Sequence, residues 1–322
     1  MNFLEKFQSV IILLAVIIGI ISAQVPIINS TAGYFIIPFL FLMLFGIFLN
    51  VPLKDFKKSF SNLKFAKLSL FMNFIWTPLF AYILGAIFLN QHVNIWIGFL
   101  MLMVTPCTDW YLVFTDIAKG NIPLSASILP LNLVLQLILL PIYLLLFIGA
   151  VGSFDFGMLF ESILYVVILP FILAQIARFI LDKYDFQFKD TFFNFFSSTQ
   201  IIFLALAIFS MFASQGNLLI QNLWVLGLLI IPILIFFIMN FFIGQFVTKY
   251  FKFNYEDSAS LSLTTLARNS PIALAIAVTA FPNQPLIALA LVIGPLIELP
   301  VLAMVSQVLL LIRKRNLHSE IS

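Results

Sequence analysis

The sequence predicts an all-α membrane protein of about ten transmembrane helices, arranged as two inverted five-helix repeats with broken crossing helices 4 and 9. Composition, the spacing of apolar segments and the placement of basic residues lead to this prediction. Of the 322 residues, 63% are hydrophobic and only 9% are charged, whereas soluble domains carry roughly 25% charged residues. Too few charges remain to cover a soluble core, so we expect one integral membrane domain over residues 1–322.

Each expected helix is a run of about 20 mostly apolar residues, long enough to span the hydrocarbon core of a bilayer. In chain order the expected spans are 7–26, 33–52, 66–89, 95–119, 123–149, 159–181, 195–214, 222–248, 257–281 and 285–312. The first span resembles a signal peptide, but Ser22-Ala23-Gln24 followed by Pro26 is a poor cleavage site. We therefore expect it to remain as a transmembrane helix. The connections are too short for a separate soluble domain.

The fourth and ninth expected spans each contain a polar break. The first break is Thr105-Pro106-Cys107-Thr108-Asp109-Trp110 and the second is Ala267-Arg268-Asn269-Ser270-Pro271. Unwound backbone at membrane depth is tolerated only where it lines a cavity or is buried in protein. Proline-interrupted helices in corresponding halves of a membrane chain therefore indicate the binding site of a carrier.

The two breaks lie at matching places in the two halves of the chain. Pro123 and Pro285 are separated by 285 − 123 = 162 positions, and the same shift places Cys107 on Asn269. It also places Gln136 on Glu298. We therefore expect two repeats, approximately 1–150 and 151–322, whose opposite orientation follows from five helices in each.

The basic residues fix the expected orientation, because Lys and Arg concentrate in cytoplasmic connections. The chain contains 16 Lys and Arg residues, and all except Arg268 fall at or beside one set of alternate connections and the two ends. These fifteen (16 − 1) are Lys6, Lys54, Lys57, Lys58, Lys64, Lys67, Lys119, Arg178, Lys183, Lys189, Lys249, Lys252, Arg313, Lys314 and Arg315. We therefore expect a multi-pass cell-membrane protein with both termini in the cytoplasm.

Ionisable residues fall at the two breaks and within the tenth expected span, where a charge is costly and by default indicates function. Arg268 lies in the second break, and Asp109 and Glu298 are its expected partners. The alternative is a structural ion pair that joins two helices. Glu298 stands between Pro295 and Pro300 in the tenth span. Because it is a carboxylate inside the membrane, we expect it to take up and release protons.

The remaining candidate residues are polar groups in or beside the breaks. Cys107 is the only cysteine, and a thiolate suits a soft, thiophilic ligand; the alternative is inert packing. The expected substrate-binding residues are Cys107, Thr108, Asp109, Arg268, Asn269 and Ser270, with Asn132 and Gln136 in support. The sequence has no Cys/His spacing for a metal and no glycine-rich phosphate loop. We therefore expect no metal, cofactor or nucleic-acid partner.

Several of these motifs resemble the bile acid:sodium symporter superfamily. Cys107-Thr108 through Ile117-Ala118-Lys119-Gly120, followed by a helix with Asn132, resembles its fourth segment, with the spacing of the arsenical-resistance (Acr3-type) permeases. Leu274 to Val278 and Gly294 to Val301 resemble the ninth and tenth segments of that branch. The resemblance implies that Cys107 and Glu298 take part in transport.

The chain also departs from the pattern that it resembles. Thr264, Arg268-Asn269 and Tyr111-Leu112 stand where sodium-coupled members carry their acidic and amide ligands. Hard cations require several oxygen ligands, and a guanidinium among them repels a second cation. Ser270-Pro271-Ile272-Ala273 replaces the Asn-Asn-Phe-Glu that precedes Leu-Ala-Ile-Ala in the arsenical-resistance pattern. The departures indicate a divergent branch without sodium coupling.

We therefore expect a secondary transporter, not an enzyme, that exports arsenite or a similar small oxyacid with the proton gradient. One alternative is a sodium- or proton-coupled transporter of organic anions, in which Arg268 binds a carboxylate or sulfonate. A second is an intramembrane hydrolase that uses Asp109 or Glu298 for acid–base chemistry, but the sequence offers no nucleophile–base arrangement for it. The sequence assigns no oligomeric state.

Overall fold

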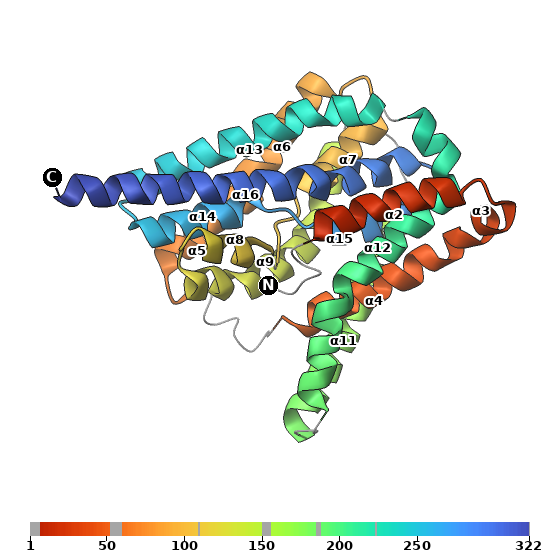
Figure 1. Cartoon of the computed structure of the whole chain (residues 1–322), viewed down its shortest axis with the longest axis horizontal. Coiled ribbons are helices and arrows are strands. Elements are labelled where there is room, and N and C mark those ends of the chain that lie inside the picture. Colours follow the sequence, from red (N-terminus) through yellow and green to blue (C-terminus); the bar gives the residue numbers. More distant parts are fainter. Residues whose placement is uncertain are drawn as a thin grey trace.

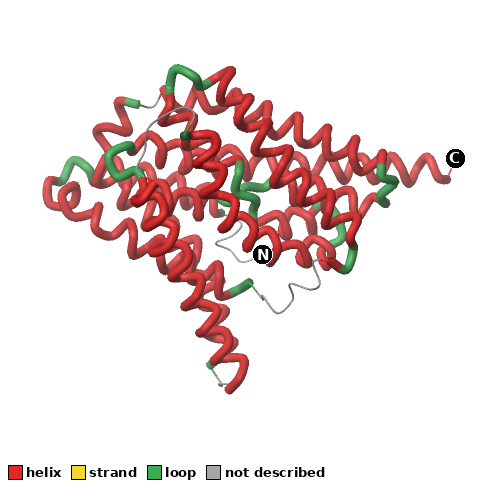
Figure 2. Tube along the Cα trace, turned by 180° about the vertical axis from the view of Figure 1, so that it is seen from behind, coloured by secondary structure: helices red, strands yellow, loops and turns green. Residues whose placement is uncertain are grey.

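The described part of the chain is built of helices. A computed structural model describes residues 7–51, 60–108, 110–149, 156–184, 188–222 and 224–321. These residues form helices joined by turns and loops, with no named strand among them (Figure 2). The helices of the N-terminal half are α2 (Gln8–Ser22), α3 (Pro26–Ala32), η1 (Gly33–Phe35), α4 (Ile36–Leu49), α5 (Leu63–Phe71), η3 (Met72–Trp76), α6 (Thr77–Phe88), α7 (Val93–Met103), α8 (Trp110–Ile117), α9 (Ile122–Tyr143) and η4 (Leu144–Ile148).

The C-terminal half continues in the same way. Its helices are α10 (Phe156–Ser162), η5 (Ile163–Ile168), α11 (Leu169–Tyr184), α12 (Lys189–Gln221), α13 (Trp224–Tyr250), α14 (Tyr255–Leu266), α15 (Ser270–Ala280) and α16 (Pro285–Ile321). The elements η3, η4 and η5 are π-helical turns within longer helices.

Length and hydropathy identify the helices that can cross a membrane. Within the described residues, seven are long and apolar enough: Pro26–Leu49, Leu63–Phe88, Ile122–Phe147, Gly157–Tyr184, Lys189–Gly216, Gly227–Tyr250 and Pro285–Arg315. Three more apolar helices are shorter: Val10–Ser22, Val93–Met103 and Ser270–Ala280. The predicted all-helical class, with many apolar helices of membrane length, is confirmed.

The helices pack in two groups (Figure 1). In the first, which we call the α12 group, α12 lies along α2, α3 and α4, and α11 packs on α4. In the second, the α16 group, the long helix α16 packs on α7, α8, α13, α14 and α15, with α5, α6 and α9 around them. Helices α10 and η5 continue into α11 and so belong to the α12 group. The two groups meet chiefly where α15 contacts α10, η5 and α4, and also where α16 contacts α2 and α12.

Four short helices lie end to end in two pairs at the centre of the α16 group. Helix α7 has 11 residues and is followed by α8, while α14 has 12 residues and is followed by α15 with 11. An 11-residue helix is roughly 16 Å long, about half of the ~30 Å hydrocarbon core. From Ile95 to Met103 every residue of α7 is buried, so this helix is enclosed by protein on all sides.

Candidate functional site

The first break separates α7 from α8 at the centre of the α16 group. Helix α7 ends at Met103 and α8 begins at Trp110. Pro106 disfavours helical geometry in the residue before it. The hydroxyl of that residue, Thr105, donates to the carbonyls of Met101 and Leu102, each at 3.0 Å. Proline and the back-bonded threonine together end the helix here.

The second break separates α14 from α15. Helix α14 ends at Leu266, and Ala267 is extended, with φ −69° and ψ 139°. Asn269 caps α15, because its Oδ1 accepts from the backbone N–H of Ile272 at 3.3 Å. The Nδ2 of Asn269 reaches back to the first break and donates to the Thr108 hydroxyl at 3.2 Å. Asn269 therefore starts α15 and also joins the two breaks.

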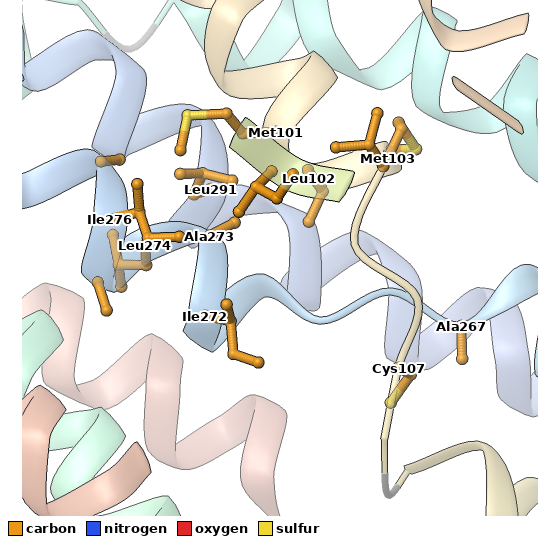
Figure 3. Packing of buried hydrophobic residues seen from close by; sticks show 14 of the residues in the cluster. Met101, Leu102, Met103, Cys107, Ala267, Ile272, Ala273, Leu274, Ile276 and Leu291 are labelled. Carbon is orange, nitrogen blue, oxygen red and sulfur yellow. The ribbon is translucent and has the colours of Figure 1, made fainter. Parts of the chain in front are cut away.

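The backbones of the two breaks pair directly, as an antiparallel bridge between Pro106 and Arg268. The N–H of Cys107 donates to the carbonyl of Ala267 at 3.0 Å, and the N–H of Asn269 donates to that of Thr105 at 2.7 Å. Figure 3 shows the two extended segments passing one another, one carrying Cys107 and the other Ala267. The pairing satisfies backbone groups that would otherwise be costly in a membrane.

The guanidinium of Arg268 lies among oxygen atoms at the ends of both interrupted helices, and only 3% of this residue is exposed. Its partners are the carbonyls of Leu266 (Nε, 3.0 Å), Met103 (Nη1, 2.9 Å) and Thr265 (Nη2), and Oδ1 of Asn73 (Nη2, 3.2 Å). The ring of Phe236 lies 5.3 Å from the guanidinium carbon. Carbonyls at a helix C-terminus carry partial negative charge, so the cation neutralises two helix ends at once.

Glu298 contacts the second break through the backbone. Its Oε1 accepts a hydrogen bond from the N–H of Arg268 at 2.7 Å, and only 4% of Glu298 is exposed. Pro295 and Pro300 both lie inside α16, on either side of the carboxylate. Glu298 therefore lies against Arg268, as expected, but the hydrogen bond between them is made by the main chain of Arg268. The other expected partner, Asp109, lies outside the described residues.

A small cavity opens beside the breaks, between the α12 group and the α16 group. Its volume is about 40 Å³, and one buried water requires roughly 10–15 Å³ on this scale. The two breaks line it with Cys107 and Trp110 of the first and Arg268, Asn269, Ser270 and Pro271 of the second. The other lining residues are Met43 and Ile47 of α4, Gln200, Ile201 and Leu204 of α12, and Pro295, Glu298 and Leu299 of α16. The space suits a small polar solute that meets a thiol and a carboxylate together.

The cavity gathers most of the candidate residues but not all of them. Cys107, Arg268, Asn269, Ser270 and Glu298 line it, and Thr108 is bonded to Asn269. Asn132 and Gln136 do not line this cavity. They lie one turn apart on α9, fully buried, and their amide atoms have no hydrogen-bond partner within the described part of the chain.

Two residues of the site were missed by sequence reasoning. Asn73 accepts from Arg268, and Gln200 lines the cavity from α12. Asn73 is an isolated amide in a mostly apolar expected span, and Gln200 ends the polar run Ser197-Ser198-Thr199-Gln200. These are the only sequence signals that the two residues give. The π-helical turn η3 contains Asn73, and such turns occur often at functional sites. They are not evident from the sequence.

Comparison with known proteins gives a family and two relatives. The model of the Sodium Bile acid symporter family matches residues 37–222, more than half of the chain. The arsenical-resistance protein Acr3 of Corynebacterium glutamicum is 25% identical over 246 residues, which cover 73% of this chain and 66% of that protein. An uncharacterized transporter, slr0944, of Synechocystis is 26% identical over 339 aligned positions, 96% of this chain and 88% of the relative. The aligned region thus spans slightly less than two thirds of the Corynebacterium protein.

Proposed function

The chain belongs to the Sodium Bile acid symporter family, and we propose that it exports arsenite or a similar small oxyacid in exchange for protons. Membership and the apolar helices make it an integral, multi-pass membrane transporter. The predicted resemblance is thereby confirmed, and a family of transporters favours a carrier over the hydrolase alternative. The substrate and the coupling ion are our proposal.

One observation carries the choice of a small substrate: the single thiol and the buried carboxylate line the same small cavity. Cys107 and Glu298 both border a space of about 40 Å³, which is too small for a sterol-sized anion and sufficient for a few waters or a small oxyacid. The similarity to an arsenical-resistance protein supports the same choice. Trivalent arsenic is a soft centre, so a thiolate suits it.

Each site residue has a separate role in this proposal. Cys107 contacts the metalloid, while Thr108, Asp109, Asn269 and Ser270 provide polar groups around it, and Glu298 carries the exchanged proton. Asn132 and Gln136 support the route from α9. Arg268 contributes its charge to the site from a fixed position, because its guanidinium donates to three carbonyls and to Asn73.

The same geometry disfavours the organic-anion alternative. In that alternative the guanidinium of Arg268 binds the carboxylate or sulfonate of the substrate. Its four hydrogen bonds are instead made to protein oxygens, and a substrate would have to displace some of them. Uptake that survives Cys107→Ala and collapses with Arg268→Gln would favour the organic anion over the oxyacid.

We further propose that residues 1–322 form one domain of ten spans in two inverted repeats, with α7–α8 and α14–α15 as the broken fourth and ninth helices. The paired breaks support this. The shift of 162 relates Pro106 to Arg268, since 268 − 106 = 162, and it turns the bond from Cys107 to Ala267 into the bond from Asn269 to Thr105. Such reciprocity is the mark of a two-fold relation.

The substrate is tested by expression in an arsenite-sensitive bacterium. The wild-type chain should raise arsenite tolerance and lower cellular arsenic, and Cys107→Ser should abolish both effects. The matched control is the double variant Cys107→Ser/Ser306→Cys, which keeps one thiol on α16 at a residue that does not line the cavity. Unchanged tolerance with the wild-type chain, or full activity of Cys107→Ser, would reject the assignment.

Coupling and orientation are tested separately. In inverted vesicles, uptake of arsenite should follow an imposed pH gradient and should not depend on a sodium gradient, and Glu298→Gln should lose the response to pH.

Reporter fusions at residues 1 and 322 should both be active in the cytoplasm, as the placement of the basic residues predicts. A periplasmic reporter at either end would contradict the ten-span arrangement.

A further inference from the structure

The surroundings of the Arg268 guanidinium have the composition of a cation site. Four oxygen acceptors converge on it: the backbone carbonyls of Met103, Thr265 and Leu266, and the amide oxygen of Asn73. Backbone and amide carbonyl oxygens are ligands of hard cations. Arg268 and its four acceptor residues are all buried in the centre of the α16 group, where oxygens without a compensating donor are costly.

The position of this site in the fold points the same way. Met103 is the last residue of α7, and Thr265 lies at the end of α14; the two are repeat mates, since 265 − 103 = 162. The negative ends of two half-helices thus converge on one point. In carriers with discontinuous helices, unwound carbonyls and half-helix C-termini of this kind coordinate the coupling cation.

We propose that the Arg268 side chain is a tethered cation that permanently occupies a site for a free monovalent cation, so that the transporter needs no sodium. The inference rests on the proposed function as a secondary transporter and defines its coupling. A covalently attached guanidinium cannot leave during the cycle. The charge that compensates the two helix ends therefore stays in place while substrate and protons exchange at the neighbouring cavity.

A direct consequence is that removing the side chain should create a cation site. In Arg268→Ala the four oxygens lose their donor while the space of the guanidinium opens. We expect the purified variant to unfold at a temperature several degrees below the wild type in choline chloride. Sodium chloride or methylguanidinium should restore part of that loss, because a ligand that binds only the folded state stabilises it. The wild type should unfold at the same temperature in all three salts.

The matched control is Arg178→Ala. The Nη1 of Arg178 donates to the carbonyl of Leu49 at the end of α4, at 2.8 Å. That guanidinium therefore also covers a helix end, but its side chain is partly exposed and lies 4.0 Å from the carboxylate of Asp182. Its removal should give no specific response to sodium or methylguanidinium. An equal response of both variants would indicate a general effect of salt and would overturn the proposal.

Transport provides the second measurement. In the wild type, the transport rate should be the same with sodium as with choline on both sides. The rate of Arg268→Lys, which retains a tethered charge, should likewise not depend on which of the two salts is present. Arg268→Ala should be slow in choline and several-fold faster in sodium or methylguanidinium. Sodium dependence in the wild type, or a folded Arg268→Ala that responds to neither cation in stability or transport, would overturn the proposal.

The two proposals can fail separately. Thermal unfolding does not depend on the substrate, so a cation response confined to Arg268→Ala would uphold the tethered cation even if arsenite is not transported. If Arg268→Ala yields no folded protein in ordinary medium, the yield of monodisperse protein with methylguanidinium in the medium becomes the readout. A yield that methylguanidinium leaves unchanged would count against the proposal.

Discussion

Glu298 is the proposed carrier of the exchanged proton, and it also accepts a hydrogen bond from the second break. Substitutions can separate these two roles. The Oε1 of Glu298 accepts from the backbone N–H of Arg268 at 2.7 Å, in the buried centre of the molecule. Glu298→Gln keeps an oxygen that can accept this bond, so it should unfold near the wild-type temperature and lose only the dependence on pH. Glu298→Ala leaves the N–H without this acceptor, which should cost about 1–3 kcal/mol. Thermal unfolding in detergent measures both.

The order of stabilities is the test in this case. If Glu298→Gln were as unstable as Glu298→Ala, the negative charge itself would hold the second break together. If neither lost stability, the hydrogen bond to Arg268 would be unimportant for folding. In either case the assignment of a separate structural task to this carboxylate would be wrong.

Asn132 and Gln136 pose a second question at the residue scale. Their four amide atoms are buried and have no hydrogen-bond partner in the described ranges, and an unsatisfied buried amide costs roughly 1–3 kcal/mol. Waters or a passing solute therefore have to satisfy them. We expect Gln136→Met to raise the free energy of unfolding by about 1–2 kcal/mol, because it removes an unsatisfied amide. It should also lower the transport rate, because the apolar side chain excludes water from this part of α9. Calorimetry and vesicle uptake measure the two effects.

A matched amide serves as the control for this prediction. Gln175 is satisfied, since its Nε2 donates to the carbonyl of Phe48 at 2.8 Å. Gln175→Met should therefore lower stability where Gln136→Met raises it. A loss of stability in both variants would indicate that Gln136 already has a partner in the folded protein and is a structural residue.

Sequence reasoning identified residues whose chemistry is anomalous where they stand. Cys107, Arg268 and Glu298 could be predicted, because a lone thiol, a cation and a carboxylate contrast with apolar surroundings. Asn73 and Gln200 could not, because single amides occur in many transmembrane helices to join neighbours. The role of Asn73 depends on a guanidinium 195 positions away in the chain, and only the tertiary structure brings the two together.

At the scale of elements, the close approach of α7 and α16 depends on a glycine. A Cβ added at Gly98 would lie 2.6 Å from the carbonyl oxygen of Ile287 and 2.7 Å from the Cβ of Ala290. Gly98→Ala should therefore push the two helices apart and lower the free energy of unfolding by about 1–3 kcal/mol. Denaturation in detergent, followed by circular dichroism, would measure the loss.

Gly227 offers the comparison within the same chain. It lies in α13, and an added Cβ would have no heavy atom within 4 Å. Gly227→Ala should be neutral or stabilising by up to about 1 kcal/mol, since alanine favours helix. Equal destabilisation by the two substitutions would mean that helix propensity, rather than the contact with α16, decides the effect at Gly98.

The extent of each helix was less predictable than its existence. The expected spans 66–89 and 257–281 agree closely with Leu63–Phe88 and with α14–α15. Helix α16 instead runs on to Ile321, beyond the expected end at 312, and α12 begins at Lys189 rather than at 195. Both extensions carry charged residues, which hydropathy excludes from a span but which a helix outside the hydrocarbon core can hold in water. The three π-helical turns have no periodic signal in the sequence.

For the whole molecule, the division into an α12 group and an α16 group was not visible in the sequence, because it depends on which apolar faces meet. The repeat and the breaks predicted a binding site at the two breaks. They did not predict that α4 and α12 would provide the facing wall of the cavity. A cavity between two helix groups suits alternating access by movement of one group against the other.

This arrangement makes Cys107 a reporter of that movement, because it is the only thiol in the chain and lines the cavity between the groups. Only 2% of it is exposed in the present conformation, so slow alkylation by a membrane-impermeant maleimide is expected at rest. A pH gradient that drives the cycle should speed labelling from one side of the membrane, because each opening of the cavity admits the reagent. Arsenite should protect the thiol. In Glu298→Gln the labelling rate should no longer follow the gradient, whereas in Gly227→Ala it should follow it as in the wild type. Labelling that is independent of both gradient and arsenite would place Cys107 in static packing and remove it from the transport path.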